Sequence, residues 1–234
     1  MTALMRMRLA AYVRTQVAFA PSLAALVILG IFYGGGQAPP EEAYGVSAVV
    51  LFPILAWQAK ILFDVEPDVQ RSIVATAVGS RAREIGCGIG AAFATAVPLI
   101  VVGLAAPWVL NAVTVPASAG CATSSVLYGL WAHLLAVAPA VALGAISSRA
   151  VMRSAGNSAA MLVSGFVLAL VLGLKGSPVP WLMPPLMPVA RLMFGASGCH
   201  AVAGLSVLGV SLWSLAWAVA VLTVYARLRR TSRP

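Results

Sequence analysis

The sequence GVSAVVLFPILAWQAKILF, residues Gly45 to Phe63, carries one ionisable side chain, Lys60, in nineteen positions. About 20 consecutive apolar residues are enough for an α-helix to cross the hydrocarbon core of a bilayer. Lys60 lies near one end of the run, so its charged group reaches the membrane surface while its methylene stem stays in apolar surroundings. The segment therefore predicts a transmembrane helix.

Five further runs have the same apolar character. They are Val17 to Tyr33, Ile85 to Leu110, Ser124 to Ser147, Ala159 to Leu174 and Ala201 to Tyr225. A transmembrane barrel would instead show alternating segments of about ten residues. We therefore expect an all-α polytopic membrane protein with six transmembrane helices, built as a single domain over residues 1–234.

The composition excludes a soluble fold and a nucleic-acid partner. Of the 234 residues, 61% are hydrophobic and 9% are charged, whereas soluble domains contain roughly 25% charged residues. The net charge of +9 does not indicate nucleic acid, because such binding gathers basic residues on one soluble face. Here they flank the apolar runs, so the expected partner is the lipid bilayer.

The distribution of Lys and Arg predicts the orientation of the chain. The N-terminal segment, the loops after the second and fourth runs and the C-terminal tail hold 13 of the 15 basic residues. The opposite side has only Lys175 and Arg191. Basic residues concentrate on the cytoplasmic side of membrane proteins, so we expect both termini in the cytoplasm. The first run is expected to remain as a span, because no small-x-small cleavage site follows it.

The N-terminal segment, residues 4–16, is too polar to cross a membrane. Leu4, Leu9 and Tyr12 share one helical face, and Arg6 and Arg14 lie off it. This pattern predicts an interfacial helix lying along the membrane. The alternative is a plain flank whose arginines only orient the first span.

The loop between the second and third runs, residues 64–84, holds four of the six acidic residues. Pro67 suits a first helical turn, Asp68 complements the helix dipole, and Gly79 followed by Ser80 is typical of one helix ending before the next begins. A short amphipathic helix of this kind binds either lipid headgroups or a groove of another protein.

The loop sequence RSIVATAVGSRAREI, from Arg71 to Ile85, follows an acidic start at Asp64. Together with six spans and an interfacial N-terminal helix, it resembles the permease subunit of type-2 ATP-binding-cassette (ABC) exporters. In that family this loop is the coupling helix that contacts the ATPase subunit. By this resemblance the coupling residues are Asp68, Arg71, Ile73, Val74, Thr76, Val78 and Arg81.

The resemblance implies a multi-pass protein of the bacterial inner membrane that pairs with a second permease, identical or different, and exports a hydrophobic or amphipathic drug, peptide, lipid or glycan. The sequence has no Gly-x-x-x-x-Gly-Lys-Ser/Thr phosphate loop. ATP and Mg²⁺ are therefore expected on a separate ATPase subunit, and this chain is expected to be a transport subunit, not an enzyme, with no cofactor or metal of its own.

Residues 175–200 contain five prolines, which exclude a regular span. In the resembled family, short re-entrant helices close the outer mouth at this position, and we expect the same here. Cys121 and Cys199 both fall on the non-cytoplasmic side, where disulfides persist. The sequence allows a bond between them or two free thiols.

Three polar or aromatic residues within the spans are candidates for the substrate pathway: His133, Gln58 and Trp57. An ionisable residue at membrane depth indicates function by default. The alternative for His133 is a neutral side chain hydrogen-bonded across a helix interface, and packing is the alternative for the other two.

Two other classes of function stay open. The sequence GASG, Gly195 to Gly198, matches the Gly-x-Ser-Gly of rhomboid-type intramembrane serine proteases. In that family the base lies on a later span, whereas His133 precedes Ser197 and His200 follows it by three residues; a Gly/Ser-rich turn is the simpler interpretation. The second class is a secondary transporter or membrane scaffold that needs no ATPase.

Overall fold

The computed structural model describes residues 2–115, 118–196 and 203–231, without the side chains at positions 68, 69, 72, 75, 230 and 231. This part of the chain is helical apart from its loops and one isolated bridge between Ala38 and Val113. The helices are α1 (Thr2–Arg14), η1 (Gln16–Ala18), α2 (Phe19–Tyr33), α3 (Pro40–Asp64), α4 (Asp68–Val78), α5 (Arg81–Val109), α6 (Ala119–Ile146), α7 (Arg149–Met152), α8 (Ala155–Leu172), η2 (Pro180–Leu182), α9 (Leu186–Gly195) and α10 (Gly204–Thr231).

Six helices within the described residues are long and apolar enough to cross a membrane, which confirms the predicted number of spans. They are α2 with η1, α3, α5, α6 with α7, α8 and α10. Helix α3 begins at Pro40, five residues before the apolar run, because a proline suits the first helical turn and Glu41 and Glu42 complement the helix dipole there. The fold is that of an all-α polytopic membrane protein.

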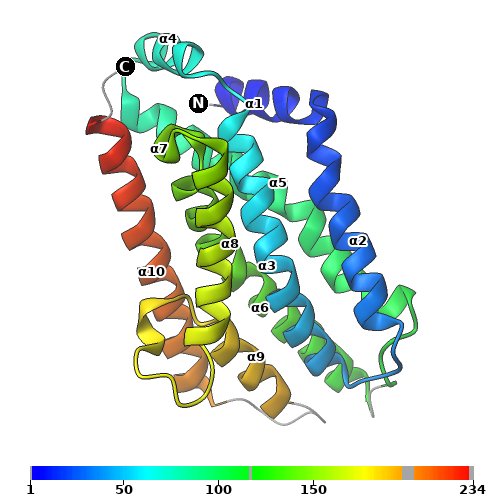
Figure 1. Cartoon of the computed structure of the whole chain (residues 1–234). Helices are drawn as coiled ribbons and strands as arrows, with labels where there is room; N and C mark the ends of the chain where they lie inside the picture. The colour runs from blue at the N-terminus through cyan, green and yellow to red at the C-terminus, as the bar shows by residue number, and fades with distance from the viewer. Residues whose placement is uncertain (1, 116–117, 197–202, 232–234) are drawn as a thin grey trace.

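Helix α3 lies at the centre of the bundle and packs mainly on α6 and α5 (Figure 1). Two glycines of α6 allow the close approach. A Cβ atom added at Gly129 would lie 2.5 Å from the ring of Tyr44, and one added at Gly144 would lie 2.5 Å from the backbone oxygen of Ala56. Small residues at such contacts are the usual means by which membrane helices approach each other.

Short helices cover the two ends of the bundle (Figure 1). Helices α1, α4 and α7 and the last turns of α10 lie at one end, which we call the α4 end. Helix α9 lies at the opposite end, the α9 end. An even number of spans returns the chain to its starting side, so the first helix and the end of the last one lie at the same end.

Helix α1 lies across the α4 end, whereas α2 runs along the bundle (Figure 1). Leu4 and Tyr12, part of the face that the sequence suggested for lipid, are buried against the protein instead. Between them in the sequence, Arg8 is also buried, with 6% of its surface exposed. The inward face of α1 is therefore a protein contact with an arginine at its centre.

Candidate functional site

Helix α4 is bounded by the residues that the sequence indicated. Pro67 precedes its first residue in an extended conformation, and Gly79 follows its last with a φ of 73°, in the left-handed region. Glycine adopts this conformation without a steric cost, which is why it commonly ends helices. Ser80 then takes the N-cap position of α5, although its side chain makes no capping hydrogen bond.

Helix α4 has an inward and an outward face. Arg71 is buried, with 6% of its surface exposed, whereas Ile73 is 62% exposed. Two positions apart on a helix means about 200° of rotation, so these two side chains point in opposite directions. Val74 and Val78 are partly buried on the Arg71 side, and Thr76 is exposed on the Ile73 side.

The predicted coupling residues are thus divided between the two faces. Arg71, Val74 and Val78 face the bundle, and Ile73 and Thr76 face outward. Arg81, at the start of α5, is exposed and donates to the backbone oxygen of Arg229 at 3.3 Å. The side chain of Asp68 lies outside the described residues.

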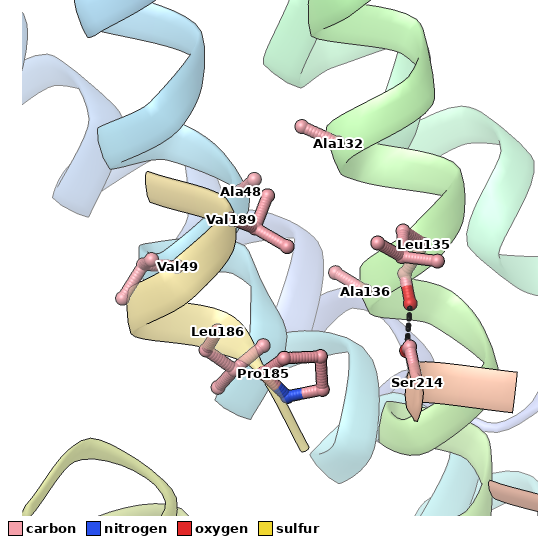
Figure 2. Close-up of a pocket in the computed structure, with 9 residues that line it drawn as sticks. All are labelled: Ala48, Val49, Ala132, Leu135, Ala136, Pro185, Leu186, Val189 and Ser214. Atoms are coloured by element: carbon pink, nitrogen blue, oxygen red, sulfur yellow. Dashed lines mark hydrogen bonds between the residues drawn. The ribbon is translucent and has the colours of Figure 1, made fainter. Parts of the chain in front are cut away.

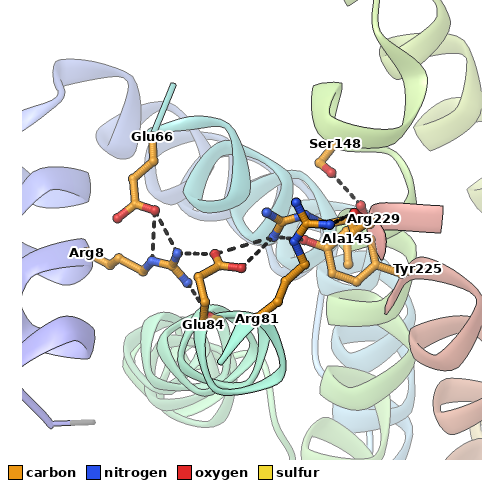
Figure 3. Close-up of polar contacts among 8 residues, drawn as sticks. All are labelled: Arg8, Glu66, Arg81, Glu84, Ala145, Ser148, Tyr225 and Arg229. Carbon is orange, nitrogen blue, oxygen red and sulfur yellow. Dashed lines mark hydrogen bonds and ion pairs between the residues drawn. The ribbon is translucent and has the colours of Figure 1, made fainter. Parts of the chain in front are cut away.

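A buried charge cluster, formed by Arg8, Glu66, Glu84 and Arg229, lies at the α4 end (Figure 3). Arg8 donates from Nη2 to Glu66 Oε2 at 2.7 Å and from Nε to the same oxygen at 3.0 Å. Its Nη2 also lies 2.5 Å from Glu84 Oε1, and its Nη1 donates to the Glu84 backbone oxygen at 2.9 Å. One guanidinium thereby joins α1, the segment before α4 and the first turn of α5.

Glu84 extends the charge cluster to the end of the chain. Nη1 of Arg229, near the end of α10, lies 3.3 Å from Glu84 Oε2 and donates to the Tyr225 hydroxyl at 3.3 Å (Figure 3). The guanidinium carbon of Arg229 is 5.8 Å from the centre of the Tyr225 ring. Arg71 of α4 lines the same small cavity as the four cluster residues. Four helices and the segment between α3 and α4 therefore meet around two carboxylates.

Burial alone would lower the pKa of Arg8, but hydrogen bonds and charge attraction from Glu66 and Glu84 raise it above its usual value. Arg8 therefore stays charged. Gly88 leaves room for it, because a Cβ atom there would lie 2.6 Å from Arg8 Nη1. Removing one partner of such a buried pair leaves an uncompensated charge, which is strongly destabilising.

No local pattern in the sequence predicted the charge cluster. The available signal was the scarcity of acidic residues, because four of only six lie in one loop beside apolar runs. Besides Glu66 and Glu84, a third acidic residue of this loop, Asp64, also binds groups within the protein. Its carboxylate pairs with Lys60 at 2.8 Å and accepts from the Arg149 backbone N–H at 2.8 Å. The acidic residues of this loop thus join the end of α3, the segment before α4 and the start of α5 to other helices.

The three predicted pathway residues lie apart from the charge cluster. His133 is fully buried in α6; its Nδ1 lies 2.7 Å from the Gly129 backbone oxygen, and its Nε2 lies 3.0 Å from Ser47 Oγ. Since a carbonyl oxygen only accepts, Nδ1 donates to it and Nε2 accepts from the Ser47 hydroxyl. Ser47 is 1% exposed, so both members of this Ser–His pair are buried between helices. The geometry is that of a bond across a helix interface.

Gln58 and Trp57 are neighbours in α3. Gln58 is buried and donates from Nε2 to the Thr95 backbone oxygen of α5 at 2.6 Å. Trp57 is half-buried. Neither side chain lines the cavity at the charge cluster.

At the α9 end, a small pocket lies between α3, α6, α9 and α10 (Figure 2). Ala48 of α3 and Ala132 and Ala136 of α6 face Leu186 and Val189 of α9 across it. Its volume of about 10 Å³ is close to that of one water molecule. The pocket is therefore small and almost entirely apolar.

Helix α9 has ten residues and is too short to cross a bilayer. Arg191 of α9 donates to the Gly173 backbone oxygen, just after α8, at 3.0 Å. The buried Met193 packs on Gly45, where an added Cβ atom would lie 3.0 Å from its own Cβ. Cys199, for which the sequence allows either a bond to Cys121 or a free thiol, lies outside the described residues, as do Ser197 and His200. Their roles stay predictions.

Comparison with protein-family models, curated proteins and solved structures found no match to this chain.

Proposed function

We propose that this chain is the transmembrane subunit of an ATP-driven ABC exporter and that α4 recruits a separate ATPase subunit. The observation that carries the proposal is the outward face of α4. Ile73, 62% exposed, projects with Thr76 and Ala77 from a helix that lies beyond the ends of the spans. An apolar side chain displayed on such a helix fits a groove in a soluble partner.

The inward face of α4 supplies the mechanical connection that this function requires. Arg71 and the charge cluster join α4 to α1, α5 and α10, and Asp64 joins the end of α3 to α7. Movement of α4 driven by the ATPase would therefore pull on several spans together. The excess of Arg and Lys at the α4 end supports a cytoplasmic location for it, where ATP is available.

The pocket beneath α9 is our candidate for the closed outer part of the substrate pathway. Its apolar lining supports a hydrophobic or amphipathic substrate, such as a drug, peptide, lipid or glycan carrying an apolar part. We place the protein in the bacterial inner membrane, paired with an identical or different permease chain. ATP and Mg²⁺ belong to the partner ATPase.

The test is affinity purification of the tagged chain from its native membrane in mild detergent, with identification of the proteins that accompany it. A phosphate-loop ATPase in equal amount is expected with the wild type, and its amount should fall at least tenfold with Ile73→Asp. Thr114→Asp, at an exposed loop residue of the α9 end, is the control and should leave recruitment unchanged.

Absence of an ATPase from the wild-type complex would overturn the proposal. Transport driven by an ion gradient, with no ATPase present, would then support the secondary transporter. If the wild type and Ile73→Asp recruit equal amounts of the ATPase, the ABC proposal would stand. The assignment of α4 as the helix that binds the ATPase would be wrong.

A further inference from the structure

The outward face of α1 has a composition unlike its inward face. Arg6, Met7, Ala10, Val13 and Arg14 are all exposed, at spacings of three and four that place them on one side of the helix. Met7 is 40% exposed and Val13 is 61% exposed. The outward face thus has apolar side chains in its middle and an arginine at each end.

Within the part of the chain that the structure describes, the two outward arginines have no anionic partner. Helix α1 contains no acidic residue. Among the described residues, the carboxylates that contact α1 are those of Glu66 and Glu84, and Arg8 binds both on the opposite face. Neither Arg6 nor Arg14 forms an ion pair within the described part of the chain. Within the described residues, the outward face therefore has no carboxylate partner such as Glu66 and Glu84 provide for Arg8 on the inward face.

The position of this face in the fold indicates which anion is near. Helix α1 leads through η1 directly into the first span, and Val17 and Phe19 at that junction are 57% and 65% exposed. The exposed apolar surface thus continues from Val13 onto the membrane-facing side of α2. A helix at the entry of a span lies at the depth of the lipid headgroups.

We propose that Arg6 and Arg14 bind the phosphates of anionic phospholipids in the leaflet at the α4 end, while Met7 and Val13 insert among the adjoining acyl chains. A guanidinium binds phosphate oxygens in pairs, and each arginine near an anionic membrane surface gains an attraction that decays within a Debye length. This surface is independent of ATPase recruitment, and its test needs no partner protein.

The test is hydrogen–deuterium exchange of the full chain in nanodiscs of phosphatidylcholine alone and of phosphatidylcholine with phosphatidylglycerol at a ratio of about 7:3. The backbone amides of residues 2–14 should exchange about tenfold more slowly with phosphatidylglycerol, since two arginine contacts reinforce each other. The difference should shrink in 0.5 M KCl, where the Debye length is about half its physiological value.

Two double variants separate the site from total charge. Arg6→Gln/Arg14→Gln should reduce the lipid-dependent slowing to less than twofold, and Arg6→Lys/Arg14→Lys should retain most of it. Arg83→Gln/Arg153→Gln removes two other exposed arginines and has the same net charge as Arg6→Gln/Arg14→Gln. Its lipid-dependent slowing should equal that of the wild type. Unchanged melting temperatures check that each variant is folded.

Three results would overturn the proposal. They are equal exchange of residues 2–14 in both lipid compositions, equal loss of the slowing in the Arg83/Arg153 control, and the same slowing by 10 mM inorganic phosphate in phosphatidylcholine nanodiscs. The last result would assign the two arginines to a free anion rather than to a lipid headgroup.

Discussion

Arg8 and Glu84 are 76 positions apart in the sequence, yet Arg8 Nη2 lies 2.5 Å from Glu84 Oε1. Because Glu84 also faces Arg229, one carboxylate joins the first and the last helix of the chain. The side chains of Arg8 and Glu84 are 7% and 1% exposed, so water screens this contact little. Each charged group in the cluster therefore depends on its partners to remain buried.

Replacing Arg8 with methionine should lower the free energy of unfolding by about 3–5 kcal/mol, because Glu66 loses its cation and Glu84 loses one of two. The measurement is unfolding in mixed micelles with increasing SDS, followed by tryptophan fluorescence. Arg6→Met, on the exposed face of the same helix, is the matched control and should change stability by no more than about 0.5 kcal/mol.

A second substitution tests whether this loss is electrostatic. Adding Glu66→Gln to Arg8→Met should restore part of the lost stability, since it removes one uncompensated carboxylate. If the two changes destabilise additively, the pair contributes packing rather than charge pairing, and our account of the cluster is wrong.

The six spans and the limits of α4 follow from local properties of the sequence. Apolar runs of sufficient length define spans, and Pro67 and Gly79 define helix ends, because both signals lie within a few residues. Helix α3 begins at Pro40, five residues before the apolar run, and this too has a local cause: a proline followed by two acidic residues favours the start of a helix.

The site depends on contacts between distant segments, which local patterns do not contain. The sequence placed Arg71 and Ile73 together as coupling residues, and the structure turns Arg71 toward the bundle and Ile73 outward. Similarly, the sequence contains 21 glycines and does not indicate that Gly129 and Gly144 are the ones that let α6 approach α3 closely. Which face of a helix is buried is decided by its neighbours.

His133 should contribute to stability rather than to transport. His133→Ala removes the bond to Ser47 and leaves a cavity between α3 and α6, so the free energy of unfolding should fall by about 2–5 kcal/mol. Ser47→Ala alone should cost about 0.5–1 kcal/mol, a typical value for hydrogen bonds between membrane helices.

In the His133→Ala background, Ser47→Ala should cost less than it does alone, because the shared bond is already absent. The same SDS titration measures all three variants. If His133→Ala unfolds like the wild type but abolishes transport, His133 is a pathway residue and the packing role assigned here is wrong.

Gly144→Ala should destabilise the protein by about 1–3 kcal/mol, because the new methyl group would meet a backbone oxygen of α3, which cannot move as a side chain can. Gly86→Ala is the matched control, since a Cβ atom at that helical glycine has no neighbour within 4 Å. It should be neutral or stabilise by up to about 1 kcal/mol. Equal effects of the two changes in thermal unfolding would show that the α3–α6 contact adjusts freely.

Tyr12 should make stability depend on alkaline pH. Burial raises the pKa of its phenol to about 12, with an opposing effect from the nearby Gln58 side chain. The unfolded-state value is about 10, so the folded state holds the proton more tightly. This contribution is complete below pH 10 and is lost as the pH rises through 12. The loss by pH 11.5 should be about 1–2 kcal/mol.

Tyr12→Phe isolates this contribution, since it keeps the ring in place and removes only the hydroxyl that donates to the Ala18 backbone oxygen. Melting temperatures of both proteins between pH 8 and pH 11.5 give the comparison. The wild type should lose stability above pH 10 more steeply than Tyr12→Phe, because deprotonation places a charge between α1 and the bundle, where water does not reach it. Parallel curves would mean that water already reaches the Tyr12 hydroxyl, and that α1 is held to the bundle by the Arg8 charge cluster without this second buried contact.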